Sequence, residues 1–136
     1  MAEEKFLFGK GVENVNYNKY FKGTSFLNVL NIPGVVVCNV TFEPACRNNW
    51  HIHQAGGQIL LCTDGHGWYQ EEGSAPRYLN PGDVVYIAPK VKHWHGAVAD
   101  EWFAHVAIEI PAGADEQGGT TWCEEVSDEE YAALTK

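Results

Sequence analysis

Residues 50–58 of the chain read WHIHQAGGQ, and residues 93–95 read HWH. Side chains alternate along a β-strand with a period of two, so His51 and His53 share one face of their strand. His93 and His95 share a face for the same reason. Imidazoles held side by side in this way can bind one metal ion. We therefore predict that the two segments form a metal site and that the rest of the chain is folded around it.

Outward from these segments, short strand-like runs alternate with turn residues. The runs are rich in β-branched and apolar residues, and Gly, Pro, Asn and Asp separate them. They cover residues 24–30, 35–42, 50–53, 58–63, 67–70, 77–79, 84–88, 91–95 and 102–110. The dipeptide Asp64-Gly65 between two of them is a strong hairpin signal. Strands at intervals of about eight to twelve residues predict an all-β barrel or sandwich.

The two ends of the chain differ from its strand-rich centre. Residues 1–23 include Asn14, Asn16 and Asn18 and are expected to form an N-terminal arm that can add to a sheet edge. Ser127 is followed three residues later by Glu130, which is the pattern of a capping box. A short C-terminal helix is therefore expected over about residues 127–135, docked through Trp122, Val126, Tyr131 and Leu134. A chain of 136 residues is the size of one domain, so we expect a single domain with its barrel over about residues 24–111.

The charge balance of the chain restricts its partners. Eighteen acidic residues against nine basic ones give a net charge of -9, which repels phosphate backbones and anionic lipid. Binding to nucleic acid or to membranes is therefore not expected. The sequence shows no export signal and no apolar run of the ~20 residues that a membrane span needs, so we expect a cytoplasmic location.

The four cysteines are widely spaced and are expected to be reduced thiols rather than a disulfide framework. They are Cys38, Cys46, Cys62 and Cys123. Cys38 and Cys62 lie in apolar runs and are expected to be packing residues. Cys46 is the cysteine that we expect near the histidines.

The predicted metal ligands are three imidazoles and one amide, from His51, His53, His93 and Gln58. The Gly56-Gly57 pair lets the chain bend, so that Gln58 can point back toward the imidazoles. This donor set suits a divalent first-row metal such as Mn, Fe, Ni, Cu or Zn. Four protein ligands leave positions open on an octahedral ion for a small-molecule substrate. Gln58 can instead hold a water molecule behind the ligands.

The remaining histidines and the tryptophan between His93 and His95 have several interpretations. His95 faces the same way as His93, so it is a further ligand, a neighbour of the ligands, a general base or a hydrogen-bonded structural residue. His66 lies in a Gly-His-Gly turn and is expected to be exposed. Trp94 must face away from the histidines, and we interpret it as a contact to another subunit in a homodimer or higher homo-oligomer.

The chain resembles a small single-domain cupin over roughly residues 35–110. Two motifs of that family occur in order and carry the resemblance: His51, His53, Gln58 and Gly65 match the first, and Gly82, Pro89 and His93 match the second. Gln58 stands where the family usually has Glu, and Ala97 stands where it often has Asn. The resemblance implies a double-stranded β-helix, the jelly-roll barrel of cupins, with His51, His53, Gln58 and His93 around a metal ion.

Within the cupins, the chain is similar to the manganese-dependent hydroxynitrile lyases and to cupins associated with carboxymuconolactone decarboxylases. Residues 92–97, which read KHWHGA, and residues 105–108, which read HVAI, carry this similarity. Four residues separate His53 from Gln58, where those lyases have three. The similarity implies manganese as the ion, and His95 and His105 as catalytic residues that move a proton. The alternatives are a metal-dependent dioxygenase and a cupin that binds a small molecule without catalysis.

Overall fold

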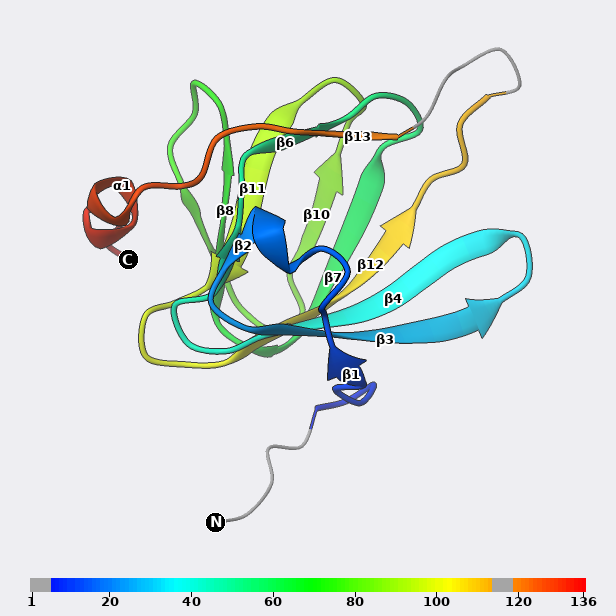
Figure 1. The fold of residues 1–136 in the computed structure, drawn as a ribbon, viewed down its shortest axis with the longest axis horizontal. Coiled ribbons are helices and arrows are strands. Elements are labelled where there is room, and N and C mark those ends of the chain that lie inside the picture. Colours follow the sequence, from blue (N-terminus) through cyan, green and yellow to red (C-terminus); the bar gives the residue numbers. More distant parts are fainter. Residues whose placement is uncertain (1–5, 114–118) are drawn as a thin grey trace.

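The computed structural model describes residues 6–113 and 119–136 (Figure 1). Within these ranges the chain forms thirteen strands, one 3-10 helix and one α-helix. In chain order they are β1 (Val12–Glu13), η1 (Asn18–Tyr20), β2 (Phe21–Lys22), β3 (Ser25–Ile32), β4 (Val35–Phe42), β5 (Arg47–Asn48), β6 (His51–His53), β7 (Gln58–Gly65), β8 (Gly67–Glu71), β9 (Arg77–Leu79), β10 (Val84–Ile87), β11 (Lys92–Ala97), β12 (Phe103–Glu109), β13 (Thr120–Trp122) and α1 (Asp128–Ala132).

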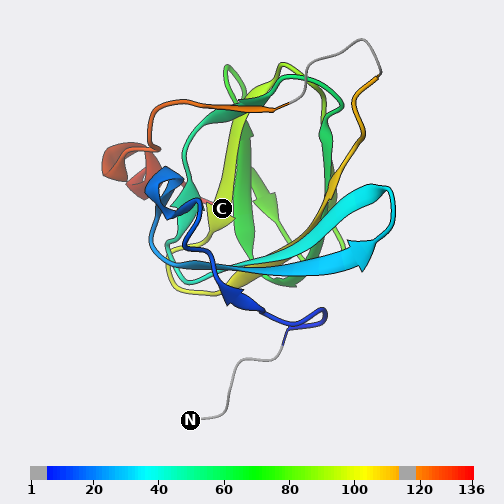
Figure 2. The same ribbon diagram turned by 45° about the vertical axis from the view of Figure 1, so that its right-hand side comes forward.

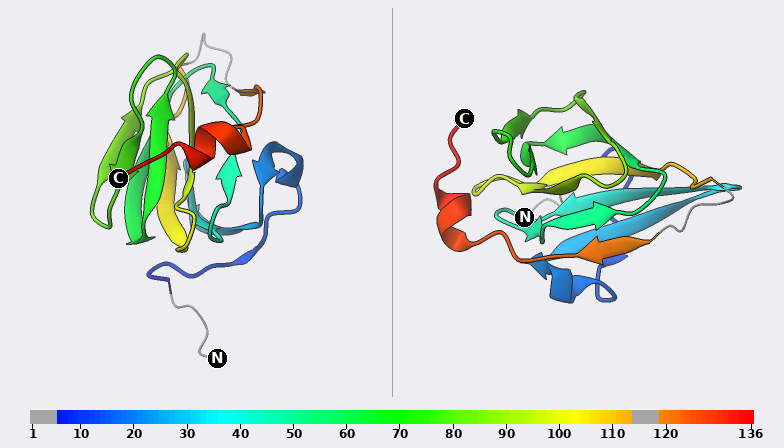
Figure 3. Two further views of the ribbon diagram at one scale, coloured as in Figure 1. Left: turned by 90° about the vertical axis from the view of Figure 1, so that its left-hand side faces the viewer. Right: turned by 90° about the horizontal axis from the view of Figure 1, so that it is seen from above.

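The strands form two antiparallel sheets that face each other (Figures 1 and 2). The first sheet has the order β1-β3-β4-β12-β7-β10. The second has the order β13-β6-β11-β5-β2, and β8 joins it by pairing with both β11 and β9. The prediction of an all-β fold with a short C-terminal helix is confirmed. Seen from above, α1 lies outside the barrel, at the end opposite the long β3–β4 hairpin (Figure 3, right).

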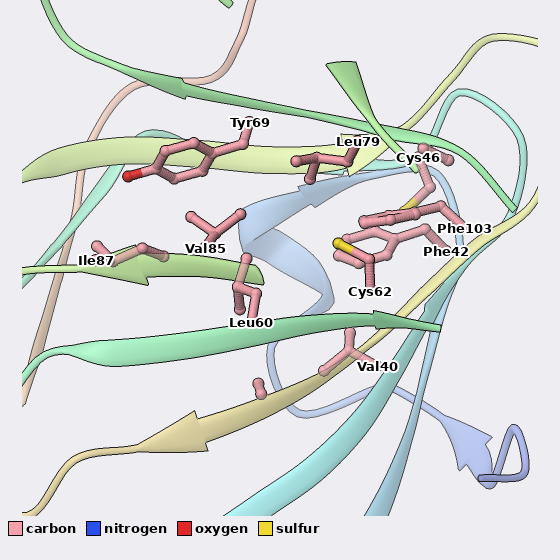
Figure 4. Packing of buried hydrophobic residues seen from close by; sticks show 12 residues of the cluster. Val40, Phe42, Cys46, Leu60, Cys62, Tyr69, Leu79, Val85, Ile87 and Phe103 are labelled. Atoms are coloured by element: carbon pink, nitrogen blue, oxygen red, sulfur yellow. The ribbon is translucent and has the colours of Figure 1, made fainter. Parts of the chain in front are cut away.

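The core fills the space between the sheets at one end of the barrel. Phe42, Leu60 and Phe103 are fully buried there, because every second side chain of a strand points inward. Figure 4 shows side chains from both sheets pointing toward one another, with Cys46 and Cys62 beside the rings of Phe42 and Phe103. All four cysteines are free, and Cys46 belongs to this core rather than to the histidine site.

The predicted hairpin at Asp64-Gly65 is wrong. Strand β7 pairs with β10 and β12 in the first sheet, whereas β8 pairs with β9 and β11 in the second. Gly65 has a φ of +66°, and a Cβ atom there would lie 1.7 Å from the carbonyl oxygen of Trp102. The chain therefore turns a corner from one sheet to the other at this glycine instead of folding back on itself.

The C-terminal helix begins as the sequence predicts. The Oγ atom of Ser127 accepts a hydrogen bond from the backbone N–H of Glu130 at 3.0 Å, and the Glu130 carboxylate accepts one from the Ser127 N–H at 3.1 Å. None of the helices among the described residues is long and apolar enough to cross a membrane.

Trp94 faces away from the histidines, but its predicted contact with another subunit is wrong. Its side chain is only 1% exposed within the chain itself. It belongs to a second apolar cluster, on which Tyr131 and Leu134 of the C-terminal segment pack. The predicted docking of Val126, Tyr131 and Leu134 is thus confirmed, while Trp122 lies in β13 instead and stacks on Tyr20, with 4.4 Å between the ring centroids.

Candidate metal centre

Three buried histidines meet on the second sheet. His51 and His53 point inward from β6, and His93 lies directly opposite His51 in the register of β6 with β11. One ring nitrogen from each of the three lies within 4.8 Å of the others. The two sequence segments are therefore adjacent strands, and their histidines are close enough to bind one metal ion.

Backbone carbonyls orient two of these rings. The Nδ1 atom of His51 donates to the carbonyl oxygen of Asn49 at 2.8 Å, and the Nδ1 atom of His93 donates to that of Val91 at 3.0 Å. A carbonyl can only accept, so the proton of each ring is on Nδ1 and the lone pair is on Nε2. The Nε2 atom of His93 is buried and has no hydrogen-bond partner among the described residues. A buried lone pair without a partner is what a metal ligand requires.

Burial also keeps these rings neutral. Burial, and then the neighbouring His93, hold the pKa of His51 well below its ordinary value of 6.5. Burial lowers the pKa of His93 to about 4, although its backbone hydrogen bond to Val91 acts in the opposite direction. A metal ion binds only the neutral imidazole, so both rings are in the binding form at neutral pH.

Gln58 is brought back to the histidines by the turn between β6 and β7. Gly56 and Gly57 have φ values of +82° and +90°, and Cβ atoms there would lie 2.0 Å and 2.6 Å from backbone carbonyl oxygens. The Oε1 atom of Gln58 lies 3.2 Å from the Nε2 atom of His53. Two adjacent donors of one ion, each bonded at about 2.1 Å, lie about 3 Å apart, so this spacing fits a shared metal.

His95 and His105 form a buried pair beside the three histidines. The Oδ1 atom of Asn48 accepts from the backbone N–H of His95 at 3.0 Å, so its Nδ2 atom is the one that faces the His95 ring. That amide donates to Nε2 of His95, the nearer ring nitrogen, at 3.2 Å. The proton of His95 is therefore on Nδ1, which donates to Nε2 of His105 at 3.2 Å.

The His95–His105 pair is also neutral. Burial, and then His105, hold the pKa of His95 well below its ordinary value, and burial lowers the pKa of His105 to about 3. The backbone N–H of His95 fixes the orientation of the Asn48 amide, and that amide determines which ring nitrogen of His95 carries the proton.

A cavity of about 530 Å³ opens onto these groups between the two sheets. Among the described residues, Glu109 is the single acidic side chain on its wall. The other lining residues include the histidines, further polar groups and apolar side chains: Asn14, Tyr17, Phe21, Leu27, Val36, Cys38, Val40, Asn48, His51, His53, Gln58, His95, His105, Ala107, Gly119, Thr120 and Trp122. The cavity thus combines apolar walls with a few polar groups, as small-molecule sites usually do.

The structure brings together all six predicted site residues, His51, His53, Gln58, His93, His95 and His105. His66 lies outside the cavity and contacts Glu101 at 2.9 Å. Of the cysteines, Cys38 and not Cys46 lines the cavity.

Sequence reasoning missed three groups of the site. Glu109 is four residues beyond His105 on β12, so the period of two places both on the same face and could have identified it. Trp122 carries no comparable signal, because it reaches the site from a strand distant in sequence. Asn48 is only three residues before His51, but its contact is with His95, 47 residues later in the chain.

Comparison with known proteins identifies the class to which this fold and this cluster belong. Residues 38–110 match the cupin domain family, and the chain belongs to that family. It is similar to the (R)-mandelonitrile lyase of Granulicella tundricola, with 43% identity over 97 residues, which is 71% of each chain.

Solved structures agree with this assignment. A cupin-like protein from Thermotoga maritima superimposes with a TM-score of 0.84 and 37% identity, over 97% of this chain and 98% of that one. An RmlC-like cupin with a double-stranded β-helix fold from Methanocaldococcus jannaschii gives a TM-score of 0.59 at 15% identity, over 82% of this chain and 94% of that one. The second similarity concerns the fold alone. The double-stranded β-helix implied by the sequence is confirmed.

Proposed function

We propose that this cupin is a metal-dependent lyase that cleaves cyanohydrins of aromatic aldehydes, such as (R)-mandelonitrile. The observation that carries the proposal is the convergence of His51, His53 and His93, of which His51 and His53 line a cavity with apolar walls. The 43% identity to an (R)-mandelonitrile lyase supports the choice of substrate.

The ligands in this proposal are His51, His53, His93 and Gln58. Their neutral nitrogen and oxygen donors suit a divalent first-row ion. Manganese is the first ion to test because the similarity to the manganese-dependent hydroxynitrile lyases implies it. When bound, such an ion supplies Lewis-acid stabilisation of negative charge on a substrate oxygen.

His95 is the proton acceptor in this proposal. Its Nε2 atom holds the lone pair and gives up only a long hydrogen bond from Asn48, of 3.2 Å, when it takes the proton of the substrate hydroxyl. As that proton leaves, the oxygen electron pair forms the carbonyl, and the C–C bond to the nitrile breaks with its electrons going to cyanide. His95 then returns the proton to cyanide, so the products are an aldehyde and hydrogen cyanide.

His105 supports this proton transfer. Its Nε2 atom accepts from Nδ1 of His95 and so spreads the positive charge that His95 carries for part of the reaction. The apolar wall, which includes Phe21, Leu27 and Val40, suits the aromatic ring of the substrate and excludes water from it.

The proposal is tested by measuring benzaldehyde release from (R)-mandelonitrile after the protein is stripped with a chelator and reloaded with Mn²⁺. We expect release by the loaded wild type, and a loss of at least about 100-fold in His51→Ala and His93→Ala, because each removes a ligand. His66→Ala is the matched control, since His66 neither lines the cavity nor belongs to the three-histidine cluster, and it should retain activity.

A fully loaded protein that releases no more benzaldehyde than free Mn²⁺ does would contradict the lyase proposal. Equal activity in His93→Ala and His66→Ala would show that the histidine cluster does not hold a metal ion that the reaction needs.

A further inference from the structure

We propose that Glu109 is a positioning residue of the metal centre. It holds the Gln58 amide with its oxygen turned toward the histidines. Its carboxylate also supplies a negative charge next to the ligands, which are themselves neutral. This inference rests on the metal site proposed above.

The backbone places Glu109 beside Gln58. The two residues are directly opposite each other in the antiparallel register of β12 with β7, and their side chains both point into the cavity. Direct cross-strand partners have Cβ atoms about 4.5–5.5 Å apart, so two long polar side chains meet there without a backbone change.

The contact between the two side chains decides which way the amide faces. The Nε2 atom of Gln58 donates to Oε2 of Glu109, while Oε1 of Gln58 faces Nε2 of His53 at 3.2 Å. A carboxylate only accepts hydrogen bonds, so it pairs with the amide nitrogen and leaves the amide oxygen for the other side. In the metal-free protein, the other side-chain contact of Gln58 among the described residues is with a ring nitrogen of His53. A ring nitrogen can either donate or accept, so this contact does not select one orientation of the amide.

Glu109 also changes the charge around the centre. The proposed ligands are three neutral imidazoles and one neutral amide, so none of them offsets the +2 charge of a divalent ion. The Glu109 carboxylate lies one side chain behind Gln58, and its Oε1 atom lies 3.8 Å from Nδ1 of His53. It therefore acts on two of the four ligands at once, and a carboxylate in this relation strengthens a ligand by polarising it.

Two substitutions separate these roles. In Glu109→Gln the new amide can still accept from Gln58 through its oxygen, so the orientation is kept and the charge is lost. In Glu109→Leu both are lost. We expect the dissociation constant for Mn²⁺, measured from the electron paramagnetic resonance signal of free Mn²⁺ during titration, to rise about 10-fold in Glu109→Gln and about 100-fold in Glu109→Leu.

A double-mutant cycle tests the orientation directly. Gln58→Ala should weaken Mn²⁺ binding strongly in the wild type and in Glu109→Gln, but only slightly in Glu109→Leu, where the amide no longer faces the ion. Glu101→Leu is the matched control, because Glu101 contacts a histidine, His66, outside the cavity and should leave Mn²⁺ binding unchanged. The circular dichroism of each metal-free variant confirms folding independently.

Wild-type affinity for Mn²⁺ in Glu109→Leu would overturn the proposal, and so would additive effects of the Gln58 and Glu109 substitutions. These readouts are separate from catalysis. If the wild type binds Mn²⁺ but does not cleave (R)-mandelonitrile, the lyase proposal is contradicted. The role of Glu109 is still tested in that case, by the Mn²⁺ dissociation constants of the Glu109 and Gln58 variants.

Discussion

Five of the six histidines are buried inside the barrel, and burial is the first cause that holds the pKa of four of them below the ordinary value. A cluster of this kind is stable only while its rings are neutral, because several buried imidazolium ions would repel one another. The same burial that prepares the rings as ligands and as a proton acceptor therefore makes the protein sensitive to acid.

His105 allows this sensitivity to be predicted from one residue. Its pKa is about 3 in the folded chain and 6.5 in the unfolded chain, so between these values the unfolded chain binds the extra proton. The contribution of His105 to the free energy of unfolding is fully present above pH 6.5 and is lost as the pH falls toward 3. By pH 5 this loss is about 2 kcal/mol.

The measurement is urea unfolding of the metal-free protein at pH 5 and at neutral pH. His105→Gln keeps an acceptor for Nδ1 of His95 and cannot titrate, so its loss of stability between the two pH values should be smaller than that of the wild type by about 2 kcal/mol. An identical loss in the two proteins would contradict the assigned pKa of His105.

At the scale of elements, the C-terminal segment is attached to the barrel by a buried arginine. The Nη2 atom of Arg47 on β5 donates to the carbonyl oxygen of Val126 at 3.0 Å and to Asp128 at 2.7 Å. Its guanidinium carbon also lies 4.2 Å from the centroid of the Tyr131 ring. Because Asn48 follows Arg47 on the same strand, this attachment also holds the group that orients His95.

We expect Arg47→Met to lower the free energy of unfolding by about 2–3 kcal/mol, since it removes these hydrogen bonds and leaves the Val126 carbonyl without a donor. Urea unfolding followed by tryptophan fluorescence measures this loss, because Trp50 and Trp94 lie in the cluster that the C-terminal segment covers.

Lys22→Met is the control for Arg47→Met. Lys22 also contacts Asp128, at 3.2 Å, but from a more exposed position, so Lys22→Met should lower the free energy of unfolding much less than Arg47→Met does. Equal costs for the two variants would show that apolar packing alone holds the segment.

At the scale of the whole molecule, the outer face of the first sheet carries a continuous apolar row. The register places five side chains next to one another across five strands, all with the parity opposite to that of the cavity residues: Tyr86, Ile59, Ile108, Val37 and Leu30. Tyr86 is 60% exposed, and the other four are partly exposed. Monomeric proteins rarely leave contiguous apolar surface of this kind uncovered.

This apolar row, and not Trp94, is therefore the surface through which we expect the homodimer to form. We expect a second copy of the chain to pack on this row, because two-fold dimers are the commonest oligomers and use the same patch on both subunits. Light scattering after size exclusion should give a dimer for the wild type and a monomer for Ile108→Lys. Val29→Lys is the control, since Val29 is also exposed but faces the other side of the same sheet. A monomeric wild type, or a dimeric Ile108→Lys, would contradict the prediction.

The sequence by itself determined the features that depend on near neighbours in the chain. The β-branched run of residues 35–42 became β4 with the predicted bounds, and Ser127 with Glu130 capped the helix as predicted. The pairing of His51 with His53 follows from the period of two, and the family motifs related both to Gln58 and His93. These predictions succeeded because strand periodicity, capping and turn bending act over a few residues.

Only the tertiary structure decided which strands lie side by side. Asp64-Gly65 has the composition of a hairpin, yet burying both inner faces requires β7 and β8 to belong to different sheets. The same choice of sheets places Glu109 opposite Gln58, Asn48 against His95, and the C-terminal segment over Trp94. Each of these contacts joins residues far apart in sequence. Their pairing is set by the burial of the whole barrel and by the register of its strands, which no local pattern encodes.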